Sequence, residues 1–405
     1  MRGCGSADWL VARASGSGVR GRGTAPTLTA APAWSDVAWN PTAGCTPVGP
    51  GCNHCEASRT VAQLSRMGGK AGARYAGLTV QRHAGAQWTG EVRVRSDLLT
   101  WPLLQRRSRR VLVSSLSDLF HEKLETEILD TVHAAMTIAH WHSFLVLTRR
   151  AERMRLYYAD PQTPARIAGE VWRLAETLLQ SGAAAPRARG EGAPPAATRR
   201  VGAGMHRYWA AGLARAIPPR VGGDGTETAP APLDPWPLPN LWLGVSVEDQ
   251  EHAGCIGQLL RTPAKFRWAC LQPLLGRVRL DLVPVGDDGY ANALSGDSNN
   301  LDGRSRCLPI MGPPWPRLDW VVVGGETGSG ARPVDPDWVR ELRDRCTDAG
   351  VPFLFEQWGE WAPVAEESFE PRLQRVGRRA AGRLIDGRSW DETPTSLRES
   401  PRRQR

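Results

Sequence analysis

The stretch Leu318-Asp319-Trp320-Val321-Val322-Val323-Gly324-Gly325-Glu326 joins an apolar run to a glycine-rich polar turn. Three consecutive valines favour a β-strand, and a strand without polar alternation is covered on both of its faces. Strands of this kind are typical of parallel sheets, in which helices make the connections between strands. The stretch therefore predicts an α/β fold built on a buried parallel sheet.

Seven other β-branched or aromatic runs share this pattern: Asp36–Trp39, Glu91–Val94, Val111–Val113, Phe144–Leu147, Leu241–Val245, Phe266–Leu271 and Val351–Phe355. Apolar residues at helical spacing lie between several of them, as in the sets Ile128, Val132, Ala135, Ala139; Ile167, Val171, Leu174, Leu178; and Val339, Leu342, Cys346. Eight strand–helix units predict a TIM-type (β/α)8 barrel, closed or partly open, and an open doubly wound sheet is the alternative.

These patterns define one domain, residues 34–363, with tails on both sides. Residues 1–33 are rich in Gly, Ala and Arg and are predicted to form a disordered N-terminal tail. Residues 181–238 and 284–316 are predicted to be two long disordered inserts, with a functional loop as the alternative for the second. Residues 364–405 are predicted to form a basic C-terminal tail that docks through Trp390.

The bulk composition argues for a water-soluble chain. Hydrophobic residues make up 41% of the 405 residues, and no apolar run approaches the roughly 20 residues that a membrane span needs. We therefore expect no membrane partner, and the absence of a visible secretory signal predicts a cytoplasmic location. The net charge of +9 permits a polyanionic partner without establishing one.

Three of the eight cysteines lie within the segment Gly44-Cys45-Thr46-Pro47-Val48-Gly49-Pro50-Gly51-Cys52-Asn53-His54-Cys55. Asn53 and Glu56 have the spacing of a variant capping box, so we expect a helix to begin beside Cys52 and Cys55. The start of a helix favours thiolates. A loop cysteine and a helix-start pair that converge on one point indicate a metal site.

The donor set favours iron over zinc. A disulfide would leave one cysteine odd, and three thiolates with an open fourth position suit a 4Fe–4S cluster. Zinc remains an alternative, with His54, His83 or His121 as the fourth ligand, as does a segment without metal.

Polar residues follow most of the predicted strands, at the edge where α/β proteins place their sites. The candidate catalytic residues are His121, Arg149, Glu248 and Glu326. The candidate cofactor-binding residues are Asn40, Ser115, Gly324 and Gly325, because glycines beside a strand end let a ligand approach the backbone. Turn and cap roles are the alternative for the serine, the glycines and Glu248.

The chain carries an ordered series of short motifs outside both inserts: Trp39-Asn40-Pro41, Gly44-Cys45, Pro50–Cys55, Ser114–His121, Val146–Arg150, Trp242–Gln250, Pro273–Gly276, Val323–Glu326, Ala331–Pro333 and Gln357–Gly359. This series resembles the phage gp thirty-seven/gp sixty-eight family of three-cysteine proteins of largely uncharacterised function. The likeness covers roughly residues 34–363. The chain differs from the usual family pattern at Gln272, where Glu is usual, at Glu356, where Lys is usual, and at Glu56, where an aromatic residue is usual.

The family looks like a divergent relative of radical S-adenosylmethionine enzymes on a TIM-type barrel. The resemblance implies that Cys45, Cys52 and Cys55 hold a 4Fe–4S cluster and that S-adenosylmethionine binds its open iron. Reductive cleavage would then give a 5′-deoxyadenosyl radical that takes hydrogen from the substrate. The C-x6-C-x2-C spacing differs from the C-x3-C-x2-C that is usual in that superfamily.

Two main hypotheses follow. The first is an iron–sulfur enzyme of phage or prophage type, with an unidentified substrate for which nucleic acid or a nucleotide is the candidate class. The second is a zinc-stabilised, non-catalytic protein that binds nucleic acid. A third is an inactive barrel that serves a partner protein.

Overall fold

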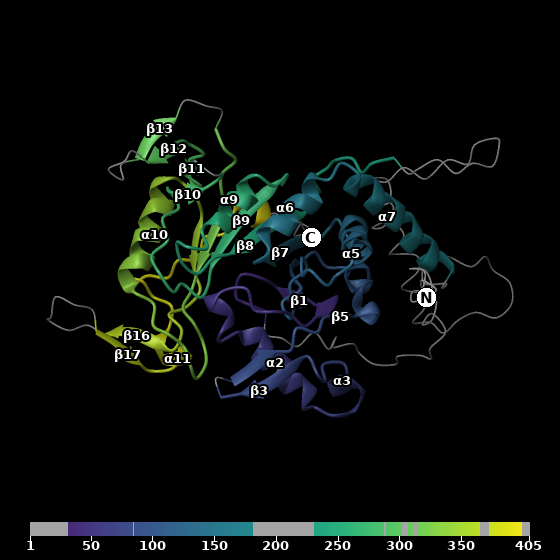
Figure 1. Ribbon diagram of the computed structural model, residues 1–405, viewed down its shortest axis with the longest axis horizontal. Helices are drawn as coiled ribbons and strands as arrows, with labels where there is room; N and C mark the ends of the chain where they lie inside the picture. Colours follow the sequence, from purple (N-terminus) through teal and green to yellow (C-terminus); the bar gives the residue numbers. More distant parts are fainter. Residues whose placement is uncertain are drawn as a thin grey trace, which may run out of the picture.

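A seven-stranded sheet lies at the centre of the computed structural model, which describes residues 31–83, 85–180, 231–286, 289–301, 307–310, 314–364 and 372–398 (Figure 1). Its strands pair in chain order: β1 (Val37–Trp39), β6 (Arg110–Val113), β7 (Ser143–Thr148), β8 (Leu241–Ser246), β9 (Phe266–Leu271), β14 (Trp320–Val323) and β15 (Phe353–Phe355). Every pairing in it is parallel. The sheet curls into a half barrel, which confirms the predicted α/β class and parallel strands.

One predicted strand, Glu91–Val94, lies outside this sheet. The structure has β5 (Arg93–Val94) at this position, paired antiparallel with β2 (Thr42–Ala43). Glu91 and Val94 are exposed, whereas a strand inside a parallel sheet needs apolar residues on both faces. The prediction of Glu91–Val94 as a barrel strand was therefore wrong. The described residues supply seven strands of a half barrel rather than the eight of a complete (β/α)8 barrel.

Helices connect the strands and cover one face of the sheet: α4 (Trp101–Leu104), α5 (Thr126–Ile138), α6 (Ala151–Ala159), α7 (Thr163–Gln180), α9 (Gly254–Leu260) and α10 (Pro336–Asp348), with a short 3-10 turn η2 (Ser96–Leu98) before α4. The predicted apolar faces are buried, as Val132 of α5 and Val171 of α7 show. At the start of α10 the Asp335 carboxylate accepts a hydrogen bond from the Asp337 N–H at 2.8 Å. This cap and Pro336 in the first turn explain why α10 begins where it does.

Aromatic side chains fill the other face of the sheet. Trp34, which precedes β1, packs against Trp268 and Trp320 with ring centroids 5.1 and 6.2 Å away. Leu397 of α12 (Thr395–Arg398) joins this cluster from the other end of the chain. The whole cluster consists of Trp34, Leu112, Leu145, Trp242, Trp268, Cys270, Trp320, Val322, Leu354 and Leu397. Residues from both ends of the described chain therefore fill the hollow of the half barrel.

A small unit separates β2 from β5 and lies at the lower end of the molecule in Figure 1. It comprises η1 (Pro50–Cys52), α2 (Glu56–Ser65), α3 (Gly69–Ala73), β3 (Thr79–Arg82) and β4 (Gly85–Trp88), with β3 and β4 antiparallel. Val61, Tyr75, Leu78 and Trp88 form its core together with Ala43 and Leu116. The unit thus places α2 and the cysteines against the rim of the sheet.

The two predicted inserts have different outcomes. Residues 181–230 lie outside the described part of the chain, as do residues 1–30. In the second insert, β10 (Val283–Pro284), β11 (Tyr290–Ala291), β12 (Ser298–Leu301) and β13 (Cys307–Ile310) form an antiparallel sheet. The Asn292 side chain accepts hydrogen bonds from the N–H groups of Leu294 and Ser295, which makes a turn between β11 and β12. Disorder was therefore the wrong prediction for the described residues of 284–316.

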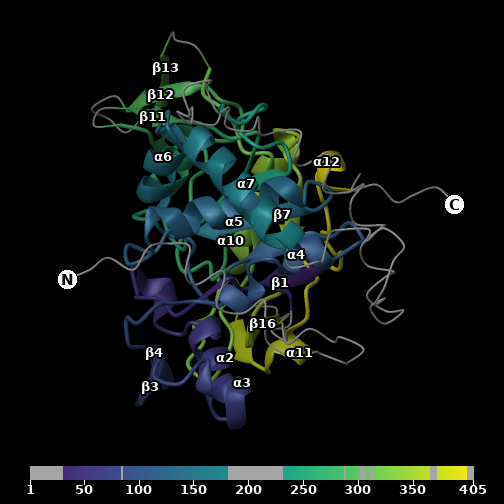
Figure 2. The same ribbon diagram turned by 90° about the vertical axis from the view of Figure 1, so that its right-hand side faces the viewer.

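The C-terminal segment packs against the domain. It contains a ribbon of β16 (Trp361–Val364) and β17 (Arg372–Arg375), followed by α11 (Arg378–Ala381) and α12, and Figure 2 shows it running along one side of the sheet. The Trp390 ring lies 6.2 Å from that of Phe353, and its carbonyl accepts from the Phe355 N–H at 2.9 Å. The predicted contact at Trp390 thus covers the outer edge of β15. Within the described residues, none of the helices has the length and hydrophobicity to cross a membrane.

The buried His133 of α5 makes the fold sensitive to acid. Its Nδ1–H donates to the Leu129 carbonyl and its Nε2 accepts from the Tyr158 hydroxyl, both at 2.7 Å. Burial lowers the pKa of His133 to about 4, from 6.5 for the unfolded chain. The unfolded chain therefore binds the proton first, and stability is lost as the pH falls from 6.5 toward 4.

We expect this residue to account for on the order of 2–3 kcal/mol of the stability lost between pH 7 and pH 4. His133→Gln keeps polar contacts without a titratable ring, so its stability should fall less over the same range. Urea unfolding of both proteins at a series of pH values measures the difference. Parallel pH profiles would contradict the assignment.

Candidate functional site

The predicted site residues gather at the carboxyl ends of the parallel strands. His121 follows β6, Arg149 follows β7, Glu248 follows β8 and Glu326 follows β14, while the cysteine segment follows β1 and β2. Two of the strand-end side chains bond directly to the cysteine segment: Glu248 accepts from the Gly51 N–H, and His121 contacts Thr46. The structure therefore brings the predicted catalytic residues and the cysteines to one edge.

The cysteine segment has a different helix start from the one predicted. Cys55, not Asn53, is the N-cap of α2, and no side chain caps this helix. The turn η1 takes Asn53 into helical backbone, where its N–H donates to the Pro50 carbonyl at 3.3 Å. The predicted capping box between Asn53 and Glu56 is therefore absent.

Burial dominates the ionisation of two of the thiols. It raises the pKa of Cys45 to about 12, an effect that Asp118 strengthens and Arg150 opposes. Burial also raises the pKa of Cys55, against the opposing effect of the Ser58 N–H. The prediction that the helix start favours a thiolate was wrong for Cys55, because desolvation outweighs the helix N–H groups.

The described residues contain no group of three His, Cys, Asp or Glu side chains that could hold a metal ion. The three cysteines therefore lie on one segment at one edge of the sheet without being arranged as a ligand set. Their Sγ atoms still share an electrostatic environment, because Cys55 contributes to the raised pKa of Cys45 and Cys52 to that of Cys55.

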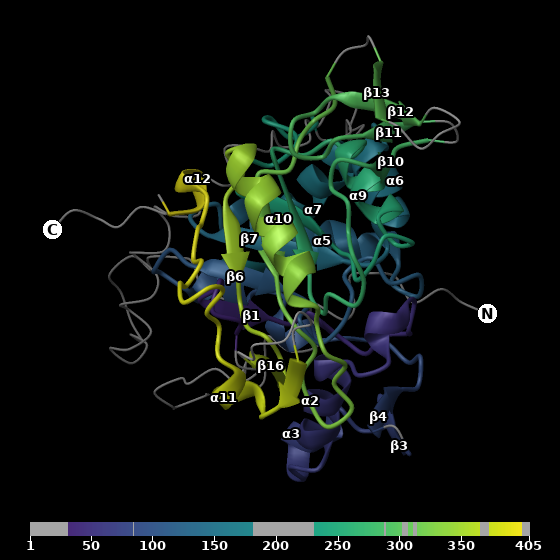
Figure 3. The same ribbon diagram turned by 90° about the vertical axis from the view of Figure 1, so that its left-hand side faces the viewer.

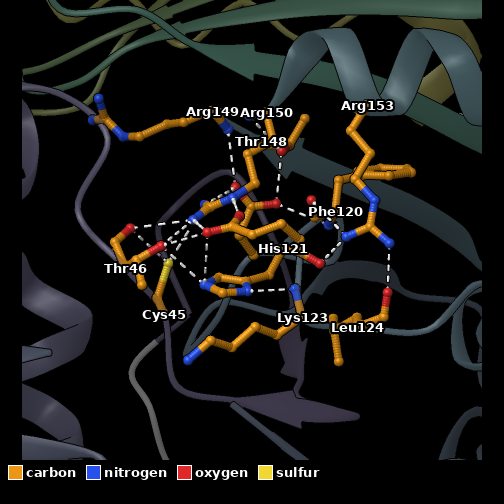
Figure 4. Close-up of polar contacts among 12 residues, drawn as sticks. Cys45, Thr46, Phe120, His121, Lys123, Leu124, Thr148, Arg149, Arg150 and Arg153 are labelled. Carbon is orange, nitrogen blue, oxygen red and sulfur yellow. Dashed lines mark hydrogen bonds and ion pairs between the residues drawn. The ribbon is translucent and has the colours of Figure 1, made fainter. Parts of the chain in front are cut away.

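Arg150 connects the cysteine segment to two carboxylates (Figure 4). Its Nη1 donates to Cys45 Sγ at 3.7 Å and to Asp118 Oδ2 at 3.1 Å, and its Nε donates to Glu122 Oε2 at 2.5 Å. Its Nη2 donates to Thr46 Oγ1 at 2.5 Å. The hydrogen bond from Arg150 lowers the pKa of Glu122 to about 2. Arg150 is thus a fixed cation beside Cys45.

Asp118 holds this arrangement together. Its Oδ1 accepts from the Thr148 hydroxyl at 2.6 Å and from the Phe120 N–H at 2.9 Å. Its Oδ2 accepts from the Arg149 N–H at 3.2 Å and from Arg150. The carboxylate therefore joins the ends of β6 and β7 and orients the arginine beside Cys45.

His121 is completely buried and neutral. Its Nδ1 accepts from the Lys123 N–H at 3.1 Å, so its proton is on Nε2, which lies 3.0 Å from Thr46 Oγ1. Burial and the nearby Arg150 lower the pKa of His121. The side chain thus supports the Thr46 end of the cysteine segment, and direct access to a substrate is closed in this conformation.

The Arg149 side chain points away from that of Arg150 (Figure 4). Its guanidinium pairs with Glu248. The Glu248 side chain is 1% exposed and that of Arg149 is 19% exposed. The other carboxylate oxygen of Glu248 accepts from the Gly51 N–H at 3.1 Å. Burial acts to lower the pKa of Arg149, but Glu248 and Cys52 raise it by a larger combined amount. The ion pair therefore fixes the middle of the cysteine segment from β7 and β8.

Glu326 fixes the same segment from β14. Its carboxylate pairs with the guanidinium of Arg332 through two contacts of 2.5 and 2.8 Å. Arg332 Nη2 also donates to the Pro50 carbonyl at 2.9 Å. Glu326 is thus an anchor for Arg332, and the partly exposed Arg332 is the residue that faces the cysteine turn.

Two predicted cofactor-binding residues serve the backbone in this structure. Asn40 Oδ1 accepts from the Ser115 hydroxyl at 3.1 Å and from the Leu116 N–H at 2.9 Å. The preceding Ser114 has a left-handed backbone, with φ of 57°. Asn40 therefore stabilises the tight turn after β6, and Ser115 has the turn role that was its alternative.

The two rim glycines differ in what they leave room for. A Cβ on Gly325 would lie 2.1 Å from the Trp358 carbonyl oxygen, whereas a Cβ on Gly324 would lie 2.9 Å from the Gln272 side chain. The amide of Gln357 donates to the Gly325 carbonyl at 2.8 Å, and its buried Oε1 has no partner among the described residues. Gly325 thus permits close backbone packing, and Gln357 Oε1 is a buried acceptor beside it.

Comparison with known proteins places the chain in a family. The sequence model of a family described as "Protein of unknown function (DUF5131)" matches residues 30–394. The chain belongs to this family. No curated protein and no solved structure matches it.

Gln272 and Glu356, two positions at which the chain differs from the resembled family pattern, are in contact in this DUF5131 protein. The Gln272 side chain hydrogen-bonds to Glu356 and acts to lower its pKa, but burial dominates and raises it. Glu356 Oε2 also accepts from the Trp34 indole at 3.0 Å, and Arg378 lies 3.8 Å from Oε1. The Glu356 carboxyl group therefore has three polar neighbours, Trp34, Gln272 and Arg378.

The sequence-based candidates leave out Asp118, Arg150 and Arg332 of this DUF5131 protein. Each lies within three residues of a candidate or directly beside one in space, and each bonds to a candidate or to the cysteine segment. The position of Asp118 and Arg150 after strands β6 and β7 is the signal that points to them. Arg332 lies in the motif Ala331–Pro333, but its spacing in the sequence does not indicate its contact with Pro50.

Proposed function

We propose that the chain is an iron–sulfur enzyme of the radical S-adenosylmethionine type, in which Cys45, Cys52 and Cys55 hold a 4Fe–4S cluster. The observation that carries the proposal is the position of the three thiols at the carboxyl end of a parallel half barrel, beside Arg149 and Arg150. This edge is where α/β proteins place their sites. The proposal also rests on the resemblance described above.

The number and type of the donors match such a cluster, whose binding would have to draw together three thiols that are not arranged as a ligand set in this structure. Three thiols occupy one segment, and three thiolates leave one iron of a 4Fe–4S cluster without a protein ligand. When bound, the cluster supplies an electron and an open iron site for S-adenosylmethionine, as the resemblance implies. Three thiolate ligands are anionic, and Arg150 donates to Cys45 Sγ while Arg149 lies in the field of Cys52 and Cys55. N–H donors to ligand sulfur and nearby cations tune such centres.

The surrounding residues restrain the segment from two sides. Glu248 accepts from the Gly51 N–H, and Arg332 donates to the Pro50 carbonyl. Both contacts act on η1, which leads directly into Cys52. Side chains locked by a second set of contacts keep a site close to its productive geometry. In the proposal, Glu248 and Arg332 are therefore positioning residues for the cysteine turn.

The test is anaerobic purification and reconstitution with iron and sulfide, followed by analysis of both elements. We expect about four irons and four sulfides per chain in the wild type, and a loss of most of both in Cys45→Ser. Cys255→Ser is the matched control, because Cys255 is a half-buried thiol whose Sγ lies 3.9 Å from the Arg149 carbonyl but outside the segment. Its iron content should equal that of the wild type.

Stoichiometric zinc without sulfide would overturn the proposal and favour a zinc-stabilised protein instead. The activity is tested separately by incubating the reduced protein with S-adenosylmethionine and measuring 5′-deoxyadenosine and methionine. A bound cluster without cleavage of S-adenosylmethionine would support the iron–sulfur part of the proposal and contradict the radical chemistry.

A further inference from the structure

Two segments of the chain carry five positive charges each and no acidic residue. Residues 57–90 contain Arg59, Arg66, Lys70, Arg74 and Arg82 and no Asp or Glu. Residues 372–385 contain Arg372, Arg375, Arg378, Arg379 and Arg383 and again no Asp or Glu. These ten residues are part of a total of 51 Lys and Arg against 42 Asp and Glu, so the rest of the chain is nearly neutral. These two segments thus contribute ten positive charges that no acidic residue within them offsets.

The two segments lie at the same end of the molecule, although nearly 300 residues separate them in sequence. Figures 2 and 3 both show α2 and α3 at the end where β16 and α11 lie. Arg59 Nη2 donates to Thr327 Oγ1 at 3.1 Å, and Arg375 Nη2 donates to the neighbouring Gly328 carbonyl at 3.1 Å. Arg378 lies 3.6 Å from Glu56 at the start of α2. The loop after β14 therefore joins both segments into one surface.

Six of these cations make no ion pair with a carboxylate among the described residues. We call them the cationic surface: Arg59, Arg66, Lys70, Arg82, Arg375 and Arg379. Three others have acidic partners: Arg74 pairs with Asp97, Arg378 with Glu56 and Glu356, and Arg383 with Asp391. Lys70, Arg82 and Arg379 are exposed. Unpaired, exposed cations of one sign create an attractive field for a polyanion.

The cationic surface is continuous with the cysteine segment. Arg59 Nη1 donates to the His54 carbonyl at 3.1 Å, and a Cβ on Gly330 would lie 2.3 Å from the His54 ring. A polyanion on this surface would therefore pass directly beside Cys52 and Cys55.

We infer that the cationic surface binds nucleic acid. Five of its six residues are arginines, whose planar guanidinium groups match phosphate oxygens in a bidentate way. Neutralised phosphates release counterions, so the binding is salt-dependent and largely independent of base sequence. This surface needs no metal, and the inference stands apart from the proposed cluster. The substrate class rests on the proposed function: in that enzyme, the position of the surface beside the cysteine segment makes nucleic acid the substrate class.

The test uses the full-length protein without reconstitution and fluorescein-labelled 20-nucleotide DNA and RNA, single-stranded and duplex, in fluorescence anisotropy. We expect Lys70→Glu/Arg82→Glu to raise Kd at least 10-fold at 50 mM salt. Its slope of log K against log salt should be smaller than that of the wild type by about 1–2. The probe with the lowest Kd shows whether the surface prefers DNA or RNA, and single strands or duplexes.

The matched control is Arg107→Glu/Lys265→Glu, which makes the same charge change at exposed residues that precede β6 and β9, at the opposite edge of the sheet. It should alter Kd less than 2-fold. Equal losses in both double variants, no binding at 50 mM salt, or equal affinity for polyglutamate would overturn the inference. The iron content of the two variants should equal that of the wild type, so failure here leaves the cluster proposal separately testable.

Discussion

Replacing Glu248 with alanine is expected to lower the free energy of unfolding by about 3–5 kcal/mol. Glu248 is 1% exposed and pairs with Arg149, so its removal leaves a largely buried guanidinium without its carboxylate. The same change removes the acceptor of the Gly51 N–H and frees the turn that leads into Cys52. Urea unfolding at pH 7.5 measures the loss.

Glu248→Gln and Asp344→Ala are the companion variants. The glutamine keeps an acceptor for the Gly51 N–H and removes only the charge, so its loss should be smaller than that of alanine. Asp344 pairs with Arg343 but is 61% exposed, and its removal should cost less than about 1 kcal/mol. A loss below about 1 kcal/mol in Glu248→Ala would contradict the role of this ion pair.

Gly325→Ala is expected to destabilise the fold by about 3 kcal/mol, because overpacking against backbone cannot be relieved by rotating a side chain. The added Cβ would lie 2.1 Å from the Trp358 carbonyl oxygen and 2.4 Å from its carbon. Since the Gly325 N–H also donates to the Gln357 carbonyl at 2.8 Å, the shift would move the rim between β14 and β15. The change in urea midpoint measures this effect.

The neighbouring Gly324→Ala is the control. Its Cβ would meet the Gln272 side chain at 2.9 Å, and that side chain can rotate away, so we expect a loss of about 1 kcal/mol or less. Equal losses at the two positions would show that Gly325 does not serve backbone packing.

The architecture of the sheet could be predicted because its strands are continuous apolar runs. Val321, Val322 and Val323 are all completely buried, as the absence of polar alternation predicts. The prediction of eight barrel strands was wrong at Glu91–Val94, because its short β-branched pattern also suits a two-residue antiparallel pair outside the main sheet. The choice between these depends on Thr42 and Ala43, which are distant from it in sequence.

The candidate site could be predicted only in part. Arg149 and Glu248 were predicted because each follows a strand. In the structure they form an ion pair, although 99 residues separate them in sequence. The same reasoning could not separate residues that face a ligand from residues that hold a turn, and Asn40 proved to hold a turn. The role of Arg332 depends on a contact with Pro50 across 282 residues, which local pattern does not contain.

The ionisation of the cysteines is the property for which the prediction from sequence and the structure differ most. The pattern predicts thiolates at Cys52 and Cys55, beside a helix start, whereas burial raises the pKa of Cys55. Burial also raises the pKa of the loop cysteine Cys45, to about 12. A metal would replace the proton on each thiol, and the bonds it forms would have to offset this cost. Metal binding should therefore release protons and weaken as the pH falls.

The central claim is that this segment holds a 4Fe–4S cluster with one open iron, and electron paramagnetic resonance of the reconstituted, dithionite-reduced protein tests it most directly. The wild type and Cys255→Ser should give the signal of a reduced 4Fe–4S cluster, and adding S-adenosylmethionine should change its shape. Cys45→Ser should lose the signal. A wild-type protein that shows no cluster signal after reconstitution and contains one zinc per chain would contradict the account.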